Sequence, residues 1–367
     1  MSFTFENARA GDRAELLASL LAAFKTNDAN HPAFDALYPD LFHDTDGAMG
    51  CHRIIRENGK IRACVGRYPM DVRIGACRVR VYGIGQVSCA PELRGGGRMT
   101  ALLNDVCAEM DASDAGLAWL SGWRPRYATF GWEAVGTNLN SYIDKKTLPE
   151  APSGWSVAEL DASQLETLDA LSRSASVLDE TSAQTRTERM MRGGKCHRVF
   201  KASRGAEVKA MCVMQAGEGA DLLEWAGDND GIRAIIAHVL KTQKGVSVTY
   251  SPIDCAARMF WDLASGFNAS LTMLRICNFK ALMKSYAPIL EKRIPAGKGI
   301  TLTIRENNAR ASIGAPGGDA LTLGRLEMTR LLFGPVAPSL TADLPDSLRW
   351  LDQVFPLPFI LPNLSHV

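Results

Sequence analysis

The chain has 367 residues, which is longer than a typical single domain, so its length predicts two or three domains. Hydrophobic residues make up 46% of it and charged residues 22%, which excludes a disordered, collagen-like or disulfide-scaffold protein. The 41 lysines and arginines nearly balance the 40 aspartates and glutamates, so no bulk positive charge is available to hold nucleic acid or an anionic membrane. The 9 cysteines form no CxxC pair and no secretory signal pattern opens the chain, which predicts a cytoplasmic protein with reduced thiols. The longest apolar stretch, residues 354–364, contains three prolines and is too short to span a bilayer, so no membrane partner is expected.

The first part of the chain predicts two helices, three antiparallel strands and then alternating helices and strands. A capping-box pattern at Asp12 and apolar residues at helical spacing predict a helix over residues 12–24, and a shorter helix follows over 32–42. Period-two runs predict strands over 52–56, 61–70 and 77–90, with turns at Asn58-Gly59 and Gly75-Ala76. A helix over 99–110, a short apolar run at 117–120, a Pro-containing segment at 124–130 and a strand over 132–142 complete this part.

A polar, Pro-rich segment at residues 145–154 predicts a linker, after which a similar order of elements returns. Helices are expected over 163–171, 182–191, 231–242 and 255–265, and strands over 197–202, 207–216, 221–226, 246–250 and 270–277. The remainder predicts a hairpin around Asn307-Asn308 and helices over 321–333 and 347–355. The whole pattern predicts an α+β protein of three domains, with boundaries at 1–146, 151–284 and 285–367.

The strongest functional signal is a glycine-rich turn between a strand and an amphipathic helix, at residues 87–100. Free N–H groups at a helix start bind phosphate oxygens, glycines let the backbone approach an anion closely, and Arg94 and Arg98 add positive charge. No GxxxxGK[ST] string occurs, which excludes a P-loop. Gly83 and Gly85 lie inside the strand pattern and the third glycine of a dinucleotide fingerprint is missing. A pyrophosphate of coenzyme A is therefore the favoured ligand.

Two motifs resemble the GNAT acetyltransferases. The fragment V-S-x-A-P-x-x-R-x-x-G resembles their motif A, with Arg94 and Gly97 in place and Met99 where a small residue is usual. Residues 127–132, Y-A-T-F-G-W, resemble the Y-x-x-F-G-[YW] stretch of the enhanced intracellular survival type, which tolerates a bulky residue at the position of Met99. The resemblance implies two tandem GNAT-like domains, mixed sheets with flanking helices, followed by a small sterol carrier protein-like α+β domain. It also implies assembly into a homo-oligomer.

The resemblance further implies acetyl transfer from acetyl-CoA to an amine, without a metal. Its cofactor-binding residues would be Val87, Ser88, Cys89, Arg94, Gly95, Gly96, Gly97, Arg98, Met99 and Thr100. Tyr127 matches the general acid of the family and the carboxylate of Val367 matches its base, whereas backbone N–H groups at 87–89 would polarise the thioester. The alternatives remain a packed aromatic role for Tyr127, His366 as the base, and a loosely packed tail.

The second domain has no comparable phosphate turn, because Asp228 and Asp230 occupy the corresponding helix start and would repel a pyrophosphate. This copy is expected to be structural. Trp119, Trp123 and Trp132 are either walls of an amine site or core residues. Two other functions stay open: a non-catalytic sensor that binds coenzyme A or lipid, and a tandem-GNAT acyl or aminoacyl transferase. The sequence does not name the amine acceptor.

Overall fold

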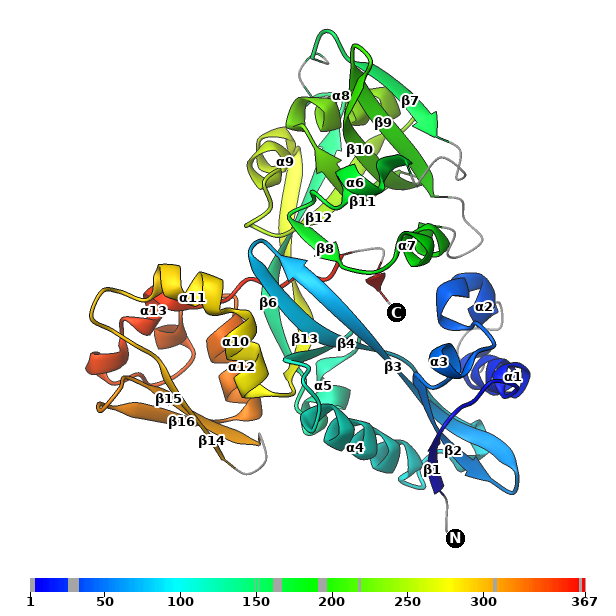
Figure 1. Ribbon diagram of the computed structural model, residues 1–367, viewed down its shortest axis with the longest axis vertical. Coiled ribbons are helices and arrows are strands. Elements are labelled where there is room, and N and C mark those ends of the chain that lie inside the picture. Colours follow the sequence, from blue (N-terminus) through cyan, green and yellow to red (C-terminus); the bar gives the residue numbers. More distant parts are fainter. Residues whose placement is uncertain are drawn as a thin grey trace.

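One mixed sheet of 13 strands extends through residues 4–276 of the computed structural model (Figure 1). The structure describes residues 4–25, 33–148, 150, 152–160, 167–190, 197–216, 219–305, 309–362 and 365–366. The strand order is β1-β2-β3-β4-β5-β13-β6-β12-β11-β10-β9-β7, and β8 pairs with β3. A separate antiparallel sheet, β14-β15-β16, belongs to the C-terminal part.

The first part of the chain supplies the strands at one end of the large sheet. Its strands are β1 (Thr4–Asn7), β2 (His52–Glu57), β3 (Lys60–Ile74), β4 (Cys77–Cys89), β5 (Leu117–Leu120) and β6 (Glu133–Asp144). Its helices are α1 (Arg13–Lys25), α2 (Phe34–Leu37), α3 (Asp46–Met49), α4 (Arg98–Asp111) and α5 (Arg124–Tyr127). The predicted helices at 12–24 and 99–110 and the predicted strands are confirmed, whereas β1 and α3 are too short to show a period in the sequence. Within residues 32–42, α2 is followed by a 3-10 turn, Pro39–Leu41.

Helices α1 and α4 cover opposite faces of strands β2 to β4. The neighbouring residues Ile54 and Ile55 of β2 point to opposite sides of the sheet, as successive strand residues do. Ile54 packs in a cluster with Leu16 of α1, and Ile55 packs in a cluster with Leu102 of α4. Helix α4 is thereby held with its first turn next to the end of β4.

The middle of the chain continues the same sheet. Its strands are β7 (Ser156–Leu160), β8 (Val177–Asp179), β9 (Arg198–Arg204), β10 (Glu207–Ala216), β11 (Ala220–Gly227), β12 (Gly245–Tyr250) and β13 (Gly266–Ile276). Its helices are α6 (Asp169–Ser172), α7 (Ala183–Met190), α8 (Asn229–Val239) and α9 (Ala257–Leu263). The predicted strands and the helices at 182–191, 231–242 and 255–265 are confirmed within the described residues, and residues 163–166 of the helix expected over 163–171 lie outside them.

Strand β13 joins the two halves of the sheet. Although it follows the middle part in sequence, it lies between β5 and β6 of the first part and pairs with both in antiparallel fashion. On its other side β6 pairs with β12 over Leu139–Asp144. Residues on each side of the expected linker at 145–154 therefore share one continuous sheet.

The C-terminal part consists of helices around the small sheet. It contains α10 (Phe279–Ser285), α11 (Ala287–Arg293), β14 (Thr301–Arg305), β15 (Arg310–Gly314), β16 (Ala320–Gly324), α12 (Arg325–Phe333) and α13 (Leu351–Val354). The helix predicted over 321–333 begins only at Arg325, because Leu321 and Leu323 alternate along β16 and pair with β15. The helix predicted over 347–355 is a 3-10 turn, Asp346–Leu348, followed by α13.

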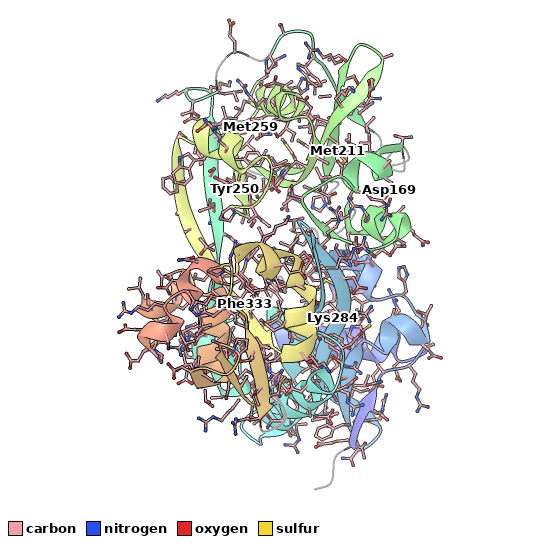
Figure 2. All side chains as sticks on the ribbon, turned by 60° about the vertical axis from the view of Figure 1, so that its left-hand side comes forward. Asp169, Met211, Tyr250, Met259, Lys284 and Phe333 are labelled. Carbon is pink, nitrogen blue, oxygen red and sulfur yellow. The ribbon has the colours of Figure 1, made fainter. Side chains whose placement is uncertain are left out.

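The core of the C-terminal part is continuous with that of the first part. Val79 and Val81 of β4 belong to the same buried cluster as Leu331 and Phe333 of α12. Phe333 lies in the lower half of Figure 2, whereas Tyr250 and Met259 lie in the upper half, in a second core built on α8 and β10 to β12. The C-terminal part is thus packed firmly against the sheet that carries the glycine-rich turn.

The last residues return to the junction of the first and middle parts. The Tyr286 hydroxyl donates to the carbonyl of Pro358 at 2.7 Å, and the Arg189 guanidinium of α7 donates to the hydroxyl of Ser365 at 3.0 Å. In Figure 1 the C-terminus lies below β8 and α7, beside the strands of the first part. Among the helices described here, none is long and apolar enough to cross a membrane.

Candidate active site

The strands β4 and β5 separate next to the glycine-rich turn. They pair in parallel over Val81–Ile84 and Leu117–Leu120, after which β5 ends and β4 continues to Cys89. Because β13 takes the opposite edge of β5, the gap opens on one side only of β4. Backbone groups of residues 85–89 are thereby turned toward a space where a ligand can pair with them.

A bulge distorts β4 at this gap. The register with β3 shifts between Cys64 and Gly66, and Gln86 has a positive φ of 49°, which is uncommon for any residue other than glycine. The Gln86 side chain accepts from the Tyr68 hydroxyl, which lies 2.9 Å from Nε2 of the fully buried His52. A Cβ at Gly66 would collide with both Tyr68 and Gln86. This buried polar chain therefore holds the bulge from behind the strand.

The glycine-rich turn leaves the start of α4 open to a ligand. Gly95 and Gly97 have φ values of 79° and 75°, and Gly97 is the N-cap, so no side chain of the described residues caps this helix. By contrast, the carboxylate of Asp228 accepts from the N–H groups of Asp230 and Gly231 at the start of α8. The prediction that aspartate caps the second helix start is confirmed, and of these two helix starts it is that of α4 which no side chain caps.

The two arginines of the turn differ in their contacts. Arg98 pairs with Glu57 at 2.7 Å and both side chains are largely buried, so its charge is already neutralised. Arg94 donates to the carbonyl of Ala23 at the end of α1, at 3.0 Å. Sequence reasoning could not distinguish these two arginines, because Glu57 is distant in the chain.

A cavity of about 770 Å³ lies along the gap between β4, α4 and the end of α1. Of the expected cofactor residues, it is lined by Val87, Ser88, Cys89, Arg94, Met99 and Thr100, whereas Gly95, Gly96, Gly97 and Arg98 are not among its lining residues. Sequence reasoning missed the remaining lining residues, Ala23, Phe24, Leu103, Asn104, Arg126, Thr129 and Phe130. The spacing of residues 126–130 around the Tyr127 motif was the one signal that could have found the last three.

Cys89 offers a thiol to this cavity but not a ready nucleophile. Burial raises the pKa of this thiol, although the positive charges of Arg98 and Arg94 oppose part of the shift. The thiolate form that a covalent mechanism requires is therefore disfavoured at neutral pH.

Tyr127 lies at the end of α5, next to the cavity but not in its lining. Its side chain is 8% exposed, and its ring packs edge-on against Trp132 with centroids 6.2 Å apart. The ring also lies against Gly122, where a Cβ would be 2.5 Å from Cε2. Burial raises the pKa of Tyr127, and Arg126 opposes part of the shift, so the hydroxyl carries its proton at neutral pH.

The helix that carries Tyr127 is anchored to the C-terminal part by Glu133. This carboxylate is 2% exposed and pairs with Arg124 of α5 and, at 2.8 Å, with Arg330 of α12. Burial alone would raise the pKa of Glu133, but the two guanidinium groups lower it overall. A similar contact joins Asp111 at the end of α4 to Arg325 of α12 at 2.9 Å. The C-terminal part thus braces both helices of the site.

A second cavity, of about 320 Å³, is lined in part by Gly122, against which the Tyr127 ring lies. Residues 119–122 and 270–273, Asn138, Asn140 and Thr249 line it together with Ile360, Leu361 and His366 of the tail. The rings of His366 and Trp119 stack with centroids 4.7 Å apart. The expected base, the carboxylate of Val367, lies outside the described residues.

The three tryptophans have different positions. Trp119 lines the second cavity, Trp132 is fully buried in the core, and Trp123 is 71% exposed. Of the alternatives left open by the sequence, the core role applies to both Trp119 and Trp132, although Trp119 also lines the second cavity.

Comparison with known proteins agrees with this geometry. Residues 5–135 match the family model described as acetyltransferase (GNAT) domain. The matched segment contains both motifs that resemble the GNAT acetyltransferases. No curated protein sequence matches the chain.

Solved structures share the fold along nearly the whole chain. A GCN5-related N-acetyltransferase from Anabaena variabilis superposes with a TM-score of 0.71 at 15% identity, covering 98% of each chain. Eis1 from Mycobacterium abscessus gives a TM-score of 0.67 at 13% identity, covering 98% of this chain and 99% of its own. A probable N-acyltransferase from Enterococcus faecalis gives 0.67 at 14% identity, covering 88% of this chain and 85% of its own. The chain thus has the fold of Eis1 and of other GCN5-related acetyltransferases, and the resemblance stated from the motifs is confirmed.

Proposed function

We propose that this protein transfers an acetyl group from acetyl-CoA to an amine. The observation that carries the proposal is the cavity at the separation of β4 and β5, inside a GNAT domain and beside an uncapped helix start. Tyr127 neighbours Arg126, which lines this cavity, and lies against Gly122, which lines the second cavity together with the tail residues Ile360, Leu361 and His366. In this proposal the first cavity holds acetyl-CoA and the second holds the amine. Tyr127, the proton donor, is next to both.

Coenzyme A would occupy the first cavity. Its pyrophosphate would bind the open N–H groups of α4, with Arg94 beside it. The amides of the pantetheine arm would pair with the backbone of residues 85–89, where β5 no longer occupies the edge of β4. The bound thioester supplies an activated acyl carbon, and backbone N–H groups at 87–89 would polarise its carbonyl.

The proposed reaction is direct attack. The amine lone pair forms the N–C bond to the acyl carbon, the C–S bond breaks, and the leaving thiolate takes the proton of the Tyr127 hydroxyl. The raised pKa of Tyr127 favours the protonated form that this role requires. The excess proton of the amine goes to a base at the chain end, which we assign to the carboxylate of Val367, because His366 lines the acceptor cavity. His366 itself is the alternative base.

The domain plan is part of the proposal. Residues 1–146 would form the catalytic GNAT domain, and 151–284 a degenerate copy that contributes β12 and β13 to the acceptor cavity. Residues 285–367 would form a sterol carrier protein-like domain that braces α4 and α5 and delivers the tail. The rival functions are a sensor without catalysis and an acyl or aminoacyl transferase; the sensor would need the first cavity but not the tail beside Trp119.

Replacement of Gly97 by aspartate tests the proposal. A Cβ at Gly97 meets no atom within 4 Å, so Gly97→Asp does not clash with the protein and instead places a negative charge at the start of α4. Acetyl-CoA affinity should fall at least about tenfold, which corresponds to roughly 1.4 kcal/mol. Calorimetric titration measures the loss, and thiol release from acetyl-CoA against a panel of amines measures transfer.

The matched control is Gly317→Asp. Gly317 also has a positive φ, 67°, and a Cβ there meets no atom within 4 Å, but it lies in the turn between β15 and β16. The control has the same backbone strain and the same added charge, and should bind acetyl-CoA as the unmodified protein does. Equal affinity in both variants would contradict the assignment of the first cavity.

A further inference from the structure

The acceptor cavity is built from neutral side chains. Among the described residues that line it there is no aspartate, glutamate, lysine or arginine. Its polar groups are hydroxyls and amides, and its apolar walls are Trp119, Leu271 and the tail residues Ile360 and Leu361. A bound ammonium group remote from the reacting nitrogen would find no opposite charge on these described walls, because the terminal carboxylate is assigned to the reacting nitrogen.

Two asparagines on β6 differ in their hydrogen bonding. The side chain of Asn140 is engaged at both ends: it accepts from the Thr249 hydroxyl at 2.7 Å and donates to Asn268 at 2.9 Å and to Ser270 at 3.1 Å. Asn138 lines the same cavity, but its Oδ1 atom is buried and has no hydrogen-bond partner among the described residues. A buried acceptor without a donor costs about 1 to 3 kcal/mol, and a ligand N–H or O–H would recover that cost.

The carboxylates beside the tail are engaged elsewhere. Glu224 and Asp254 line a separate small cavity that shares Ile360 and Leu361 with the acceptor cavity. Glu224 pairs with Arg186 and accepts from Ser172, and Asp254 accepts from the indole of Trp225 at 3.1 Å. Neither carboxylate is a lining residue of the acceptor cavity.

We infer that the acceptor is an amine with a single ionisable nitrogen and a neutral body that donates a hydrogen bond to Asn138, such as an amino alcohol or an amino amide. Polycationic amines are disfavoured, because the terminal carboxylate is assigned to the reacting nitrogen and a second ammonium would be desolvated without a counter-charge of its own. This inference rests on the acetyl transfer proposed above. It defines a substrate class from the walls of the second cavity alone.

Three five-carbon amines that differ only at the far end test this inference. 5-Aminopentan-1-ol ends in a hydroxyl, pentylamine in a methyl group and 1,5-diaminopentane in a second ammonium. With saturating acetyl-CoA, kcat/KM from thiol release should be highest for the amino alcohol and at least about tenfold lower for the diamine, since tenfold corresponds to roughly 1.4 kcal/mol. A diamine preferred over the amino alcohol would overturn the inference and leave the proposed function in place. Absence of transfer to every amine of a broad panel would overturn the proposed function instead.

Asn138→Asp supplies the missing counter-charge at nearly constant shape. This variant should raise kcat/KM for the diamine relative to the amino alcohol by at least about tenfold. Asn229→Asp, on the exposed first turn of α8, adds the same charge far from the cavity and should leave the ratio as in the unmodified protein. An unchanged ratio in a folded Asn138→Asp protein would refute the role of Asn138, and an equal change in both variants would assign the effect to general electrostatic attraction.

Discussion

Acidification to about pH 5 is expected to weaken this fold through one residue, His52. Its ring is fully buried beneath the bulge of β4, with Nδ1 3.2 Å from the carbonyl of Met49 and Nε2 2.9 Å from the Tyr68 hydroxyl. Burial lowers the pKa of His52 from 6.5 to about 4, and the nearby positive charge of Arg67 acts in the same direction. The folded protein therefore keeps this ring neutral at a pH where the unfolded chain protonates it.

The sign and size of the effect follow from these two pKa values. Between about pH 6.5 and pH 4 the unfolded state binds the proton and the folded state does not, so stability is lost as the pH falls. At about pH 5 this difference in proton binding lowers the free energy of unfolding by roughly 2 kcal/mol relative to about pH 7. The loss approaches roughly 3 kcal/mol below pH 4. Above about pH 7 the residue contributes no pH dependence.

Urea denaturation at about pH 7.5 and pH 5 measures this contribution. A His52→Gln variant cannot titrate at this position, although it loses the bond to Met49 and so starts from a lower stability. Other groups titrate equally in both proteins, so the loss between the two pH values should be smaller in the variant by roughly 2 kcal/mol. If the variant loses as much stability as the unmodified protein, His52 is not held neutral and the polar chain behind β4 is wrongly interpreted.

Two further predictions concern the reaction. Tyr127→Phe should reduce kcat by about 100-fold or more and leave acetyl-CoA affinity unchanged, as measured by steady-state kinetics and calorimetry; full turnover with chemistry rate-limiting would return Tyr127 to a packing role. A Gly-Ser extension after Val367 moves the terminal carboxylate by up to about 7 Å and should abolish transfer while acetyl-CoA still binds, whereas Val367→Ala keeps a terminal carboxylate and should lose far less. Equal activity of the extended and unmodified proteins would remove the chain end from the mechanism.

Several parts of the site follow from short stretches of sequence. The hairpin between β3 and β4, the glycine-rich turn and the stripe on α4 each depend on residues close together in the chain, and all were predicted. The motif around Tyr127 likewise pointed to residues beside the cavity, although the helix α5 that carries Tyr127 was not predicted. Local conformational preferences and periodicity are sufficient for such features.

Contacts between distant segments could not be predicted in this way. Glu57 neutralises Arg98, which the sequence had placed at the phosphate, and the fit of Gly66 against Tyr68 and Gln86 shapes the bulge. Nothing in residues 94–100 indicates that one arginine is engaged and the other lines the cavity. The charge that a ligand meets depends on these tertiary pairs.

The sequence by itself determined the surroundings of the first cavity: a strand, an open glycine-rich turn and a helix, which are contiguous and locally encoded. Only the tertiary structure decided the second cavity, because it is lined by five separate segments that meet when β13 inserts between β5 and β6 and the tail returns to Trp119. Strand pairing across more than a hundred residues is selected by the burial of whole faces of the sheet, which no local pattern records.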